Sequence, residues 1–232
     1  MTATILVINP NSDTEVTAHL DAVLAGLRHD GGPRIECATL AGAPKGIQTA
    51  TDVAVVIGPL CRLVERRESE ADAFVIACFG DPGVHAVREL TKKPVIGIGE
   101  AGLTAALSFG ERIGIVTNLA TDIAGHHRQN RSLGIADRVA GVRAVGIPVV
   151  GLADEAKGLP RMVEAGRALV EQDGAQVIVP ACAGMARYNE RLRRAVGVPV
   201  IDATVAAVGL ALAAIGGAFT AVAEPAARRA AS

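Results

Sequence analysis

The sequence of 232 residues is poor in aromatic side chains and carries almost no net charge. Aromatic residues make up 2% of the chain, with one Tyr and no Trp, so a surface that stacks on nucleobases or sugars is not expected. The formal net charge is −1, and the sequence has no polybasic run. Such a chain lacks the basic surface that binds nucleic acid or an anionic membrane, so we expect neither partner.

Signals for export and for metal binding are missing as well. The sequence leads from Met1 into an apolar segment too short for a signal peptide or a membrane span, so we expect a cytoplasmic protein. The four cysteines form neither a CxxC motif nor a Cys/His cluster with zinc-site spacing; they are Cys37, Cys61, Cys78 and Cys182. We expect free thiols, no metal and no other cofactor.

Short β-branched runs alternate with segments of helical periodicity along the chain, of which 50% is hydrophobic. The expected strands are residues 5–8, 34–39, 73–77, 94–98, 112–116, 139–147, 176–180 and 198–201. The expected helices are residues 16–27, 51–70, 82–91, 100–108, 120–133, 156–173, 185–195 and 203–215. This alternation predicts an α/β protein with mostly parallel sheets flanked by helices.

The second half of the sequence repeats parts of the first half. Residues 71–78 are echoed by residues 175–182, and residues 94–96 by residues 199–201, at offsets of 104 and 105 residues. The repeat predicts two pseudo-symmetric lobes with the active site in the cleft between them. We expect a first lobe of residues 1–99 and 203–220, a second lobe of residues 100–202, and a flexible tail of residues 221–232.

One cysteine follows a buried strand at the equivalent position of each half. Cys78 comes after the strand 73–77, and Cys182 comes after the strand 176–180. Ligands of open α/β sheets bind at the carboxyl ends of the strands. Each cysteine precedes a turn into a helix, so we expect free N–H groups and the helix dipole to lower both thiol pKa values toward neutrality. Cys37 and Cys61 lie within a strand and a helix, and we expect structural roles for them.

Two thiols that face each other across a cleft suggest one class of reaction. A single cysteine at a strand end is commonly structural, whereas two at symmetric positions favour catalysis. One thiolate removes a proton from a carbon acid, and the opposing thiol returns a proton to the other face. The same N–H groups stabilise the oxygen of the enolate. The product is the mirror image of the substrate, and the reaction needs neither a metal nor a lysine Schiff base.

The residues around these cysteines resemble the aspartate/glutamate racemase superfamily and, within it, the hydantoin/allantoin racemase branch. The resemblance covers residues 4 to 216. It is carried by Ile8-Asn9-Pro10-Asn11-Ser12, by Ile76-Ala77-Cys78-Phe79-Gly80-Asp81-Pro82-Gly83, by residues 94–101, and by Cys182-Ala183-Gly184-Met185 with residues 197–202. The pair of cysteine motifs is specific, because amino-acid racemases of the superfamily usually carry Asn-Thr after the first cysteine.

The resemblance implies cofactor-independent racemisation of a small hydantoin-like cyclic ureide, either a 5-substituted hydantoin or allantoin. It implies Cys78 and Cys182 as the two catalytic bases and a homo-oligomeric assembly. The substrate-binding residues that it implies are Asn11, Ser12, Phe79, Gly80, Thr117, Ala183 and Gly184.

Two departures from the branch leave other functions open. The loop at residues 43–49 reads APKGIQT, where hydantoin racemases commonly show Gly-Pro-x-x-Ile-Glu, and this change concerns the 5-substituent or the ring itself. Pro180-Ala181 stands where Leu-Gly is usual. The alternatives are an amino-acid racemase for aspartate or glutamate, an enzyme like maleate isomerase, and a non-catalytic binding protein. Arylmalonate decarboxylase usually needs only the second cysteine, so Cys78 argues against it.

Several polar residues near these motifs have simpler expected roles. Ser12 begins a capping pattern, Asp81 precedes Pro82 as the expected N-cap of its own helix, and Asp202 is expected to cap the last helix. His126 and His127 are adjacent on an expected helix, and we expect both of them to face solvent.

Overall fold

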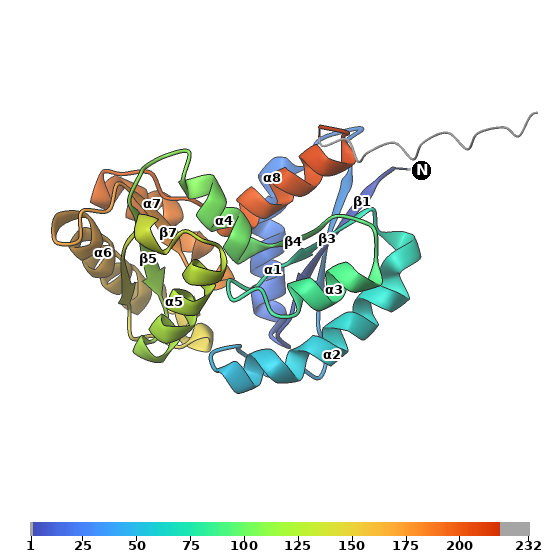
Figure 1. Ribbon diagram of the computed structural model, residues 1–232, viewed down its shortest axis with the longest axis horizontal. Helices are drawn as coiled ribbons and strands as arrows, with labels where there is room; N and C mark the ends of the chain where they lie inside the picture. Colours follow the sequence, from blue (N-terminus) through green and yellow to red (C-terminus); the bar gives the residue numbers. More distant parts are fainter. Residues whose placement is uncertain (1, 219–232) are drawn as a thin grey trace, which may run out of the picture.

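The first lobe is built on a sheet of four parallel strands, ordered β2-β1-β3-β4. A computed structural model describes residues 2–218 (Figure 1). The strands are β1 (Thr4–Asn9), β2 (Arg34–Thr39), β3 (Ala73–Ile76) and β4 (Val95–Gly97). These four elements were expected from the sequence, and their parallel pairing confirms the α/β fold class.

The second lobe has a parallel sheet of three strands, ordered β6-β5-β7. The strands are β5 (Ile113–Thr117), β6 (Val139–Ala144) and β7 (Val177–Pro180). The expected strand at residues 198–201 is wrong as a full strand, because only Val200 forms a bridge, to Ile178. The chain leaves this sheet almost at once, since Asp202 already caps the next helix.

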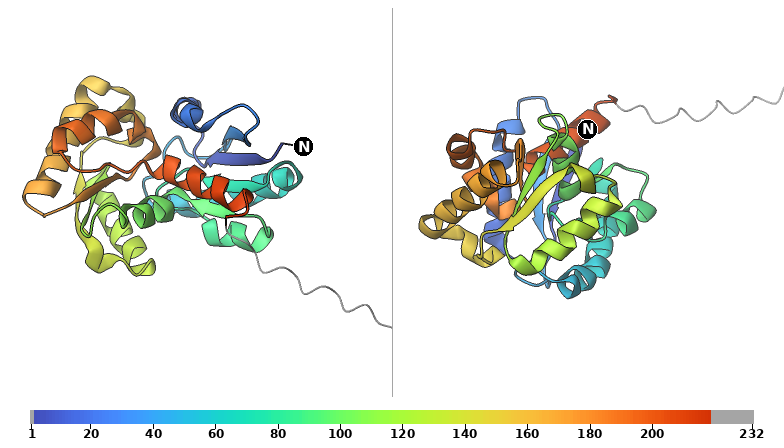
Figure 2. Two further views of the ribbon diagram at one scale, coloured as in Figure 1. Left: turned by 90° about the horizontal axis from the view of Figure 1, so that it is seen from above. Right: turned by 60° about the vertical axis from the view of Figure 1, so that its left-hand side comes forward.

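Helices cover both faces of each sheet, and the two lobes lie side by side along the long axis of the molecule (Figures 1 and 2). They are α1 (Thr14–Val23), α2 (Ala50–Arg67), α3 (Val84–Leu90), α4 (Ile98–Ala106), α5 (Ile123–Ser132), α6 (Glu155–Glu171), α7 (Asn189–Val196) and α8 (Ala203–Ile215). Within residues 2–218, no helix is long and apolar enough to cross a membrane.

Alternate residues of β1 enter two different hydrophobic cores. Ile5 and Val7 join a core that also contains buried residues of β5, β7, α4 and α8, whereas Leu6 and Ile8 pack with the buried face of α2. Successive side chains of a strand point to opposite faces, and a parallel sheet buries both. One core therefore runs from the first lobe into the second, and it fixes the strand ends of both sheets relative to each other.

The division of the chain into lobes at particular residues stays a prediction. The helix α8 packs on β1, β3 and β4 of the first sheet, and it also contacts α4. Figure 1 shows α4 in the middle of the molecule, between β4 and β7. The expected tail at residues 221–232 lies outside the described residues.

Local caps differ in part from the sequence-based expectation. Asp13, and not Ser12, caps α1, because the Asp13 carboxylate accepts from the backbone N–H of Glu15 at 2.9 Å. The backbone N–H of Ser12 donates to the carbonyl of Pro44 at 3.0 Å. Asp202 caps α8 as expected, by accepting from two backbone N–H groups of its first turn.

The contact between α4 and α8 gives a prediction about stability. A methyl group on Gly102 of α4 would lie 2.7 Å from Cβ and 3.0 Å from Cα of Ala203, so Gly102→Ala must push the helices apart. We expect a loss of about 1–3 kcal/mol in the free energy of unfolding. The matched change Gly209→Ala in α8, where no atom lies within 4 Å, should instead add about 0.5–1 kcal/mol. Urea denaturation measures both, and equal stability of the two variants would contradict the packing described here.

Candidate active site

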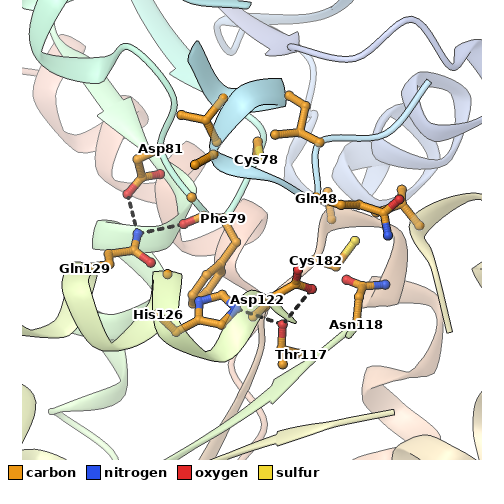
Figure 3. A pocket seen from close by; sticks show the side chains of 18 of the residues that line it. Gln48, Cys78, Phe79, Asp81, Thr117, Asn118, Asp122, His126, Gln129 and Cys182 are labelled. Atoms are coloured by element: carbon orange, nitrogen blue, oxygen red, sulfur yellow. Dashed lines mark hydrogen bonds between the residues drawn. The ribbon is translucent and has the colours of Figure 1, made fainter. Parts of the chain in front are cut away.

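A cavity of about 720 Å³ lies at the carboxyl ends of strands from both sheets (Figure 3). Most of the residues implied by the resemblance line it; they are Asn11, Cys78, Phe79, Gly80, Thr117, Cys182, Ala183 and Gly184. Ser12 is not among the lining residues, and neither are Cys37 and Cys61. The fold therefore brings both strand-end cysteines to one cavity, although they are far apart in the sequence.

Cys78 is placed by the loop that follows β3. The backbone N–H of Ala77 donates to Ile8 at 2.8 Å, which extends the parallel ladder by one residue. The loop then turns, with the N–H of Asp81 donating to the carbonyl of Cys78 at 2.9 Å. The helix α3 begins only at Val84, so the expectation that Cys78 faces a helix N-terminus is wrong. The backbone N–H of Gly80 lowers the pKa of the Cys78 thiol instead.

Cys182 is placed directly at the start of a helical segment. The N–H of Ala181 donates to Val116 at 2.7 Å, which ties the end of β7 to β5. Cys182 is the N-cap of a 3-10 helix, Ala183–Tyr188. The backbone N–H groups of Gly184 and Met185 lower the pKa of its thiol. The expected N–H groups therefore act on both thiols, but only Cys182 owes them to a helix start.

Burial dominates the protonation of both thiols. It raises the pKa of Cys78 to about 12 and the pKa of Cys182 to about 11, against the lowering effect of the N–H groups. The neighbouring thiol and the carboxylates of Asp81 and Asp122 raise the pKa of Cys78 further. The expectation that both pKa values fall toward neutrality is wrong, because removing the charged thiolate from water costs more than a few N–H dipoles return.

Asp122 is a charged group close to both sulfurs. Its carboxylate accepts from the backbone N–H of Leu119 at 2.9 Å, and the hydroxyl of Thr117 lies 3.5 Å from the same carboxylate. The negative charge raises the pKa of Cys78 and of Cys182. In Figure 3, Asp122 lies between His126 of α5 and Cys182.

Asp81 caps a helix other than the expected one. Its carboxylate oxygens accept from the backbone N–H groups of Gly99 at 2.8 Å and Glu100 at 2.7 Å, at the start of α4. Gly83 is the N-cap of α3, so the predicted role of Asp81 on its own helix is wrong. Asp81 itself has a φ of 47°, which turns its side chain toward α4. Burial raises the pKa of Asp81 to about 7, against the lowering effect of these hydrogen bonds.

His126 is buried, and the expectation that it faces solvent is wrong. Its Nε2 lies 2.8 Å from the hydroxyl of Thr117, and its ring packs against the ring of Phe79 in a T-shaped arrangement with centroids 5.5 Å apart. Burial lowers the pKa of His126. His127 is exposed, as expected. Because α5 carries few apolar residues, its sequence does not indicate which face turns inward.

The polar cavity residues that the sequence reasoning missed include Gln48, Asn118, Asp122 and Gln129. Asp122 follows Leu119 by three residues, which is a capping spacing. Gln129 lies nearly one helical turn after His126. Within residues 2–218, no group of three His, Cys, Asp or Glu is arranged to hold a metal ion.

Known proteins resemble this chain over most of its length. Residues 5–211 match the Asp/Glu/Hydantoin racemase family. A hydantoin racemase of Paenarthrobacter aurescens is 37% identical over 89% of both chains, and one of Rhizobium meliloti is 35% identical over 91% of this chain and 88% of its own. The solved structure of the allantoin racemase from Klebsiella pneumoniae superposes with a TM-score of 0.85 at 31% identity, covering 93% of this chain and 88% of that one.

The raised thiol pKa values predict slow alkylation at neutral pH. Only thiolate reacts, so we expect the rate of Cys182 to rise about tenfold for each pH unit below its pKa, with Cys78 slower throughout. Iodoacetamide labelling followed by peptide mass spectrometry measures the two sites separately. A half-maximal rate near pH 7 at either cysteine would contradict the dominance of burial.

Proposed function

Because the chain belongs to the Asp/Glu/Hydantoin racemase family and is therefore an isomerase, we propose that it racemises 5-substituted hydantoins or allantoin without a cofactor. The proposed bases are Cys78 and Cys182. The observation that carries the proposal is that one cavity is lined by both thiols, each at the end of a strand from a different lobe.

The proposed reaction moves one proton to each side of the substrate stereocentre. One thiolate takes the proton from the carbon, and the electron pair of the C–H bond moves onto the adjacent ring carbonyl. The opposing thiol then gives its proton to the other face of the planar carbanion, and it becomes the thiolate. The products are the inverted ring and the same thiol/thiolate pair with the roles exchanged, so atoms and charge balance.

Burial of the thiols has two opposite effects on this scheme. It keeps the thiolate scarce at neutral pH, because the pKa values of Cys182 and Cys78 are about 11 and about 12. It also makes the thiolate that does form a stronger base toward a weak carbon acid. The active form needs one thiol and one thiolate, so the apparent ionisations that bound activity belong to the pair and not to either residue.

The polar groups of the cavity favour a neutral cyclic ureide over a dicarboxylic amino acid. The carboxyl groups of Asp81, Glu100 and Asp122 line it, and Glu100 is already paired with Arg88. Arg128 is the single arginine among the described lining residues that could meet a substrate carboxylate. Gln48 adds a buried Nε2 that has no hydrogen-bond partner within the described structure. An amide N–H of this kind suits a substrate carbonyl oxygen, because a buried donor without an acceptor costs about 1–3 kcal/mol.

The names of the similar proteins support the same substrate class. The curated relatives at 35–37% identity are hydantoin racemases, and the structure from Klebsiella pneumoniae is an allantoin racemase. A homo-oligomeric assembly and a cytoplasmic location stay predictions that rest on the sequence.

The two thiols are predicted to act on opposite enantiomers. We expect Cys78→Ser and Cys182→Ser each to lower racemisation of allantoin or a 5-substituted hydantoin by at least about 100-fold, since a hydroxyl is a much weaker acid–base catalyst here. Each variant keeps one thiol and should still exchange the stereocentre proton of one enantiomer, with opposite preferences. Proton NMR in deuterated solvent, started from each pure enantiomer, measures the exchange.

The control variants are Cys37→Ser and Cys61→Ser, which lie outside the cavity and should leave the rate nearly unchanged. Aspartate and glutamate serve as comparison substrates and should show no racemisation. Exchange of the same enantiomer by both active-site variants, or turnover of the amino acids in place of the ureides, would overturn the proposed function.

A further inference from the structure

The loop that carries Cys78 is held by a side chain from the other lobe. Gln129 lies on α5, which packs against β6 of the second sheet. Its Nε2 donates to the carbonyl oxygen of Phe79 at 2.7 Å and to the Asp81 carboxylate at 3.2 Å. Phe79 directly follows Cys78. The lobe that contains Cys182 therefore donates a hydrogen bond to the backbone next to Cys78 (Figure 3).

The Asp81 carboxylate links this contact to α4. It accepts from Gln129 and also from the backbone N–H groups of Gly99 and Glu100, at the start of the helix between the two sheets. A carboxylate with three N–H donors is held in one orientation. The Cys78 loop is thus fixed at two points, by α4 through Asp81 and by α5 through Gln129.

The close fit of the surrounding backbone leaves little freedom for another arrangement. A methyl group on Gly99 would collide with the carbonyl oxygen of Phe79 and with the amide of Gln129. The ring of Phe79 is also held, because it forms a T-shaped contact with the ring of His126, which lies nearly one helical turn before Gln129. Two residues of α5 on the same helix face therefore contact Phe79: Gln129 at its carbonyl and His126 at its ring.

The geometry points to Gln129 as a positioning residue that sets where Cys78 stands relative to Cys182. This inference rests on the proposed function for its catalytic meaning, but the contact itself concerns only the loop. The amide N–H group of Gln129 makes the contacts with the loop, whereas its Oε1 is buried with no partner within the described structure. Gln129 does not transfer a proton; it holds the loop that carries one of the two bases.

The first test measures the loop without any substrate. Gln129→Met keeps the length of the side chain and removes both hydrogen bonds, and Gln129→Glu keeps the shape but turns the donor into an acceptor. We expect alkylation of Cys78 at about pH 9 to rise at least about fivefold in both variants, because the freed loop opens to solvent, while Cys182 changes less than about twofold. The matched control is Gln172→Met, at the exposed end of α6.

Two results would overturn the inference. One is no change at Cys78 in either folded variant, with folding checked by thermal unfolding. The other is an equal acceleration at Cys78 and Cys182, which would mean that the whole structure has loosened.

The second test uses the catalytic readout. In the Cys182→Ser background, Gln129→Met should slow proton exchange by Cys78 at least about tenfold, as misplacement of a catalytic group does. In the Cys78→Ser background, the same change should leave exchange by Cys182 nearly unaltered. Equal slowing in both backgrounds would contradict a positioning role. If neither background exchanges protons at all, the proposed function fails, and the alkylation result still decides the role of Gln129.

Discussion

The desolvation of two half-buried thiols in one cavity is the constraint on which the proposed chemistry of this protein depends. Backbone N–H groups lower both thiol pKa values, yet desolvation raises the pKa of Cys182 to about 11 and that of Cys78 to about 12. The nearby charge of Asp122 acts in the same direction. Raised pKa values of this kind favour the protonated form of both thiols at neutral pH, and the proposed reaction needs a substrate whose C–H proton a strong thiolate base can remove.

The fold brings these two thiols together from distant parts of the chain. Parallel strands place their carboxyl ends on one edge, and a hydrophobic core shared by both sheets fixes the two edges against each other. The helices α4 and α8 meet closely where Gly102 faces Ala203, and a methyl group at position 102 does not fit there. Gln129 reaches from the second lobe to the backbone beside Cys78. The spacing of the two sulfurs therefore depends on contacts that cross between the lobes.

Much of this arrangement could be predicted from the sequence, because it follows from local pattern. The periodicity of the apolar residues predicted the parallel strands, and the repeat placed Cys78 and Cys182 at equivalent strand ends. The predictions that were wrong concern contacts between segments that are distant in the sequence. Asp81 caps α4 across 18 residues of sequence and not its own helix. His126 is buried by packing against Phe79 of the other lobe. The thiol pKa values follow from the closure of a cavity that no single segment forms.

The central claim is that two opposed thiols serve the two faces of one substrate, and early turnover of the unaltered protein in deuterated solvent tests it most directly. The reaction starts from one pure enantiomer and is stopped before equilibrium, and mass spectrometry then measures deuterium in the product and in the remaining substrate. If different thiols take and return the proton, the product carries deuterium while the remaining substrate keeps its proton. With both thiols present, the carbanion is protonated before the thiol that took the proton exchanges with solvent, whereas in a single-thiol variant the carbanion lasts long enough for that exchange. Early deuterium in both enantiomers to the same extent would show a single exchanging base and contradict the account.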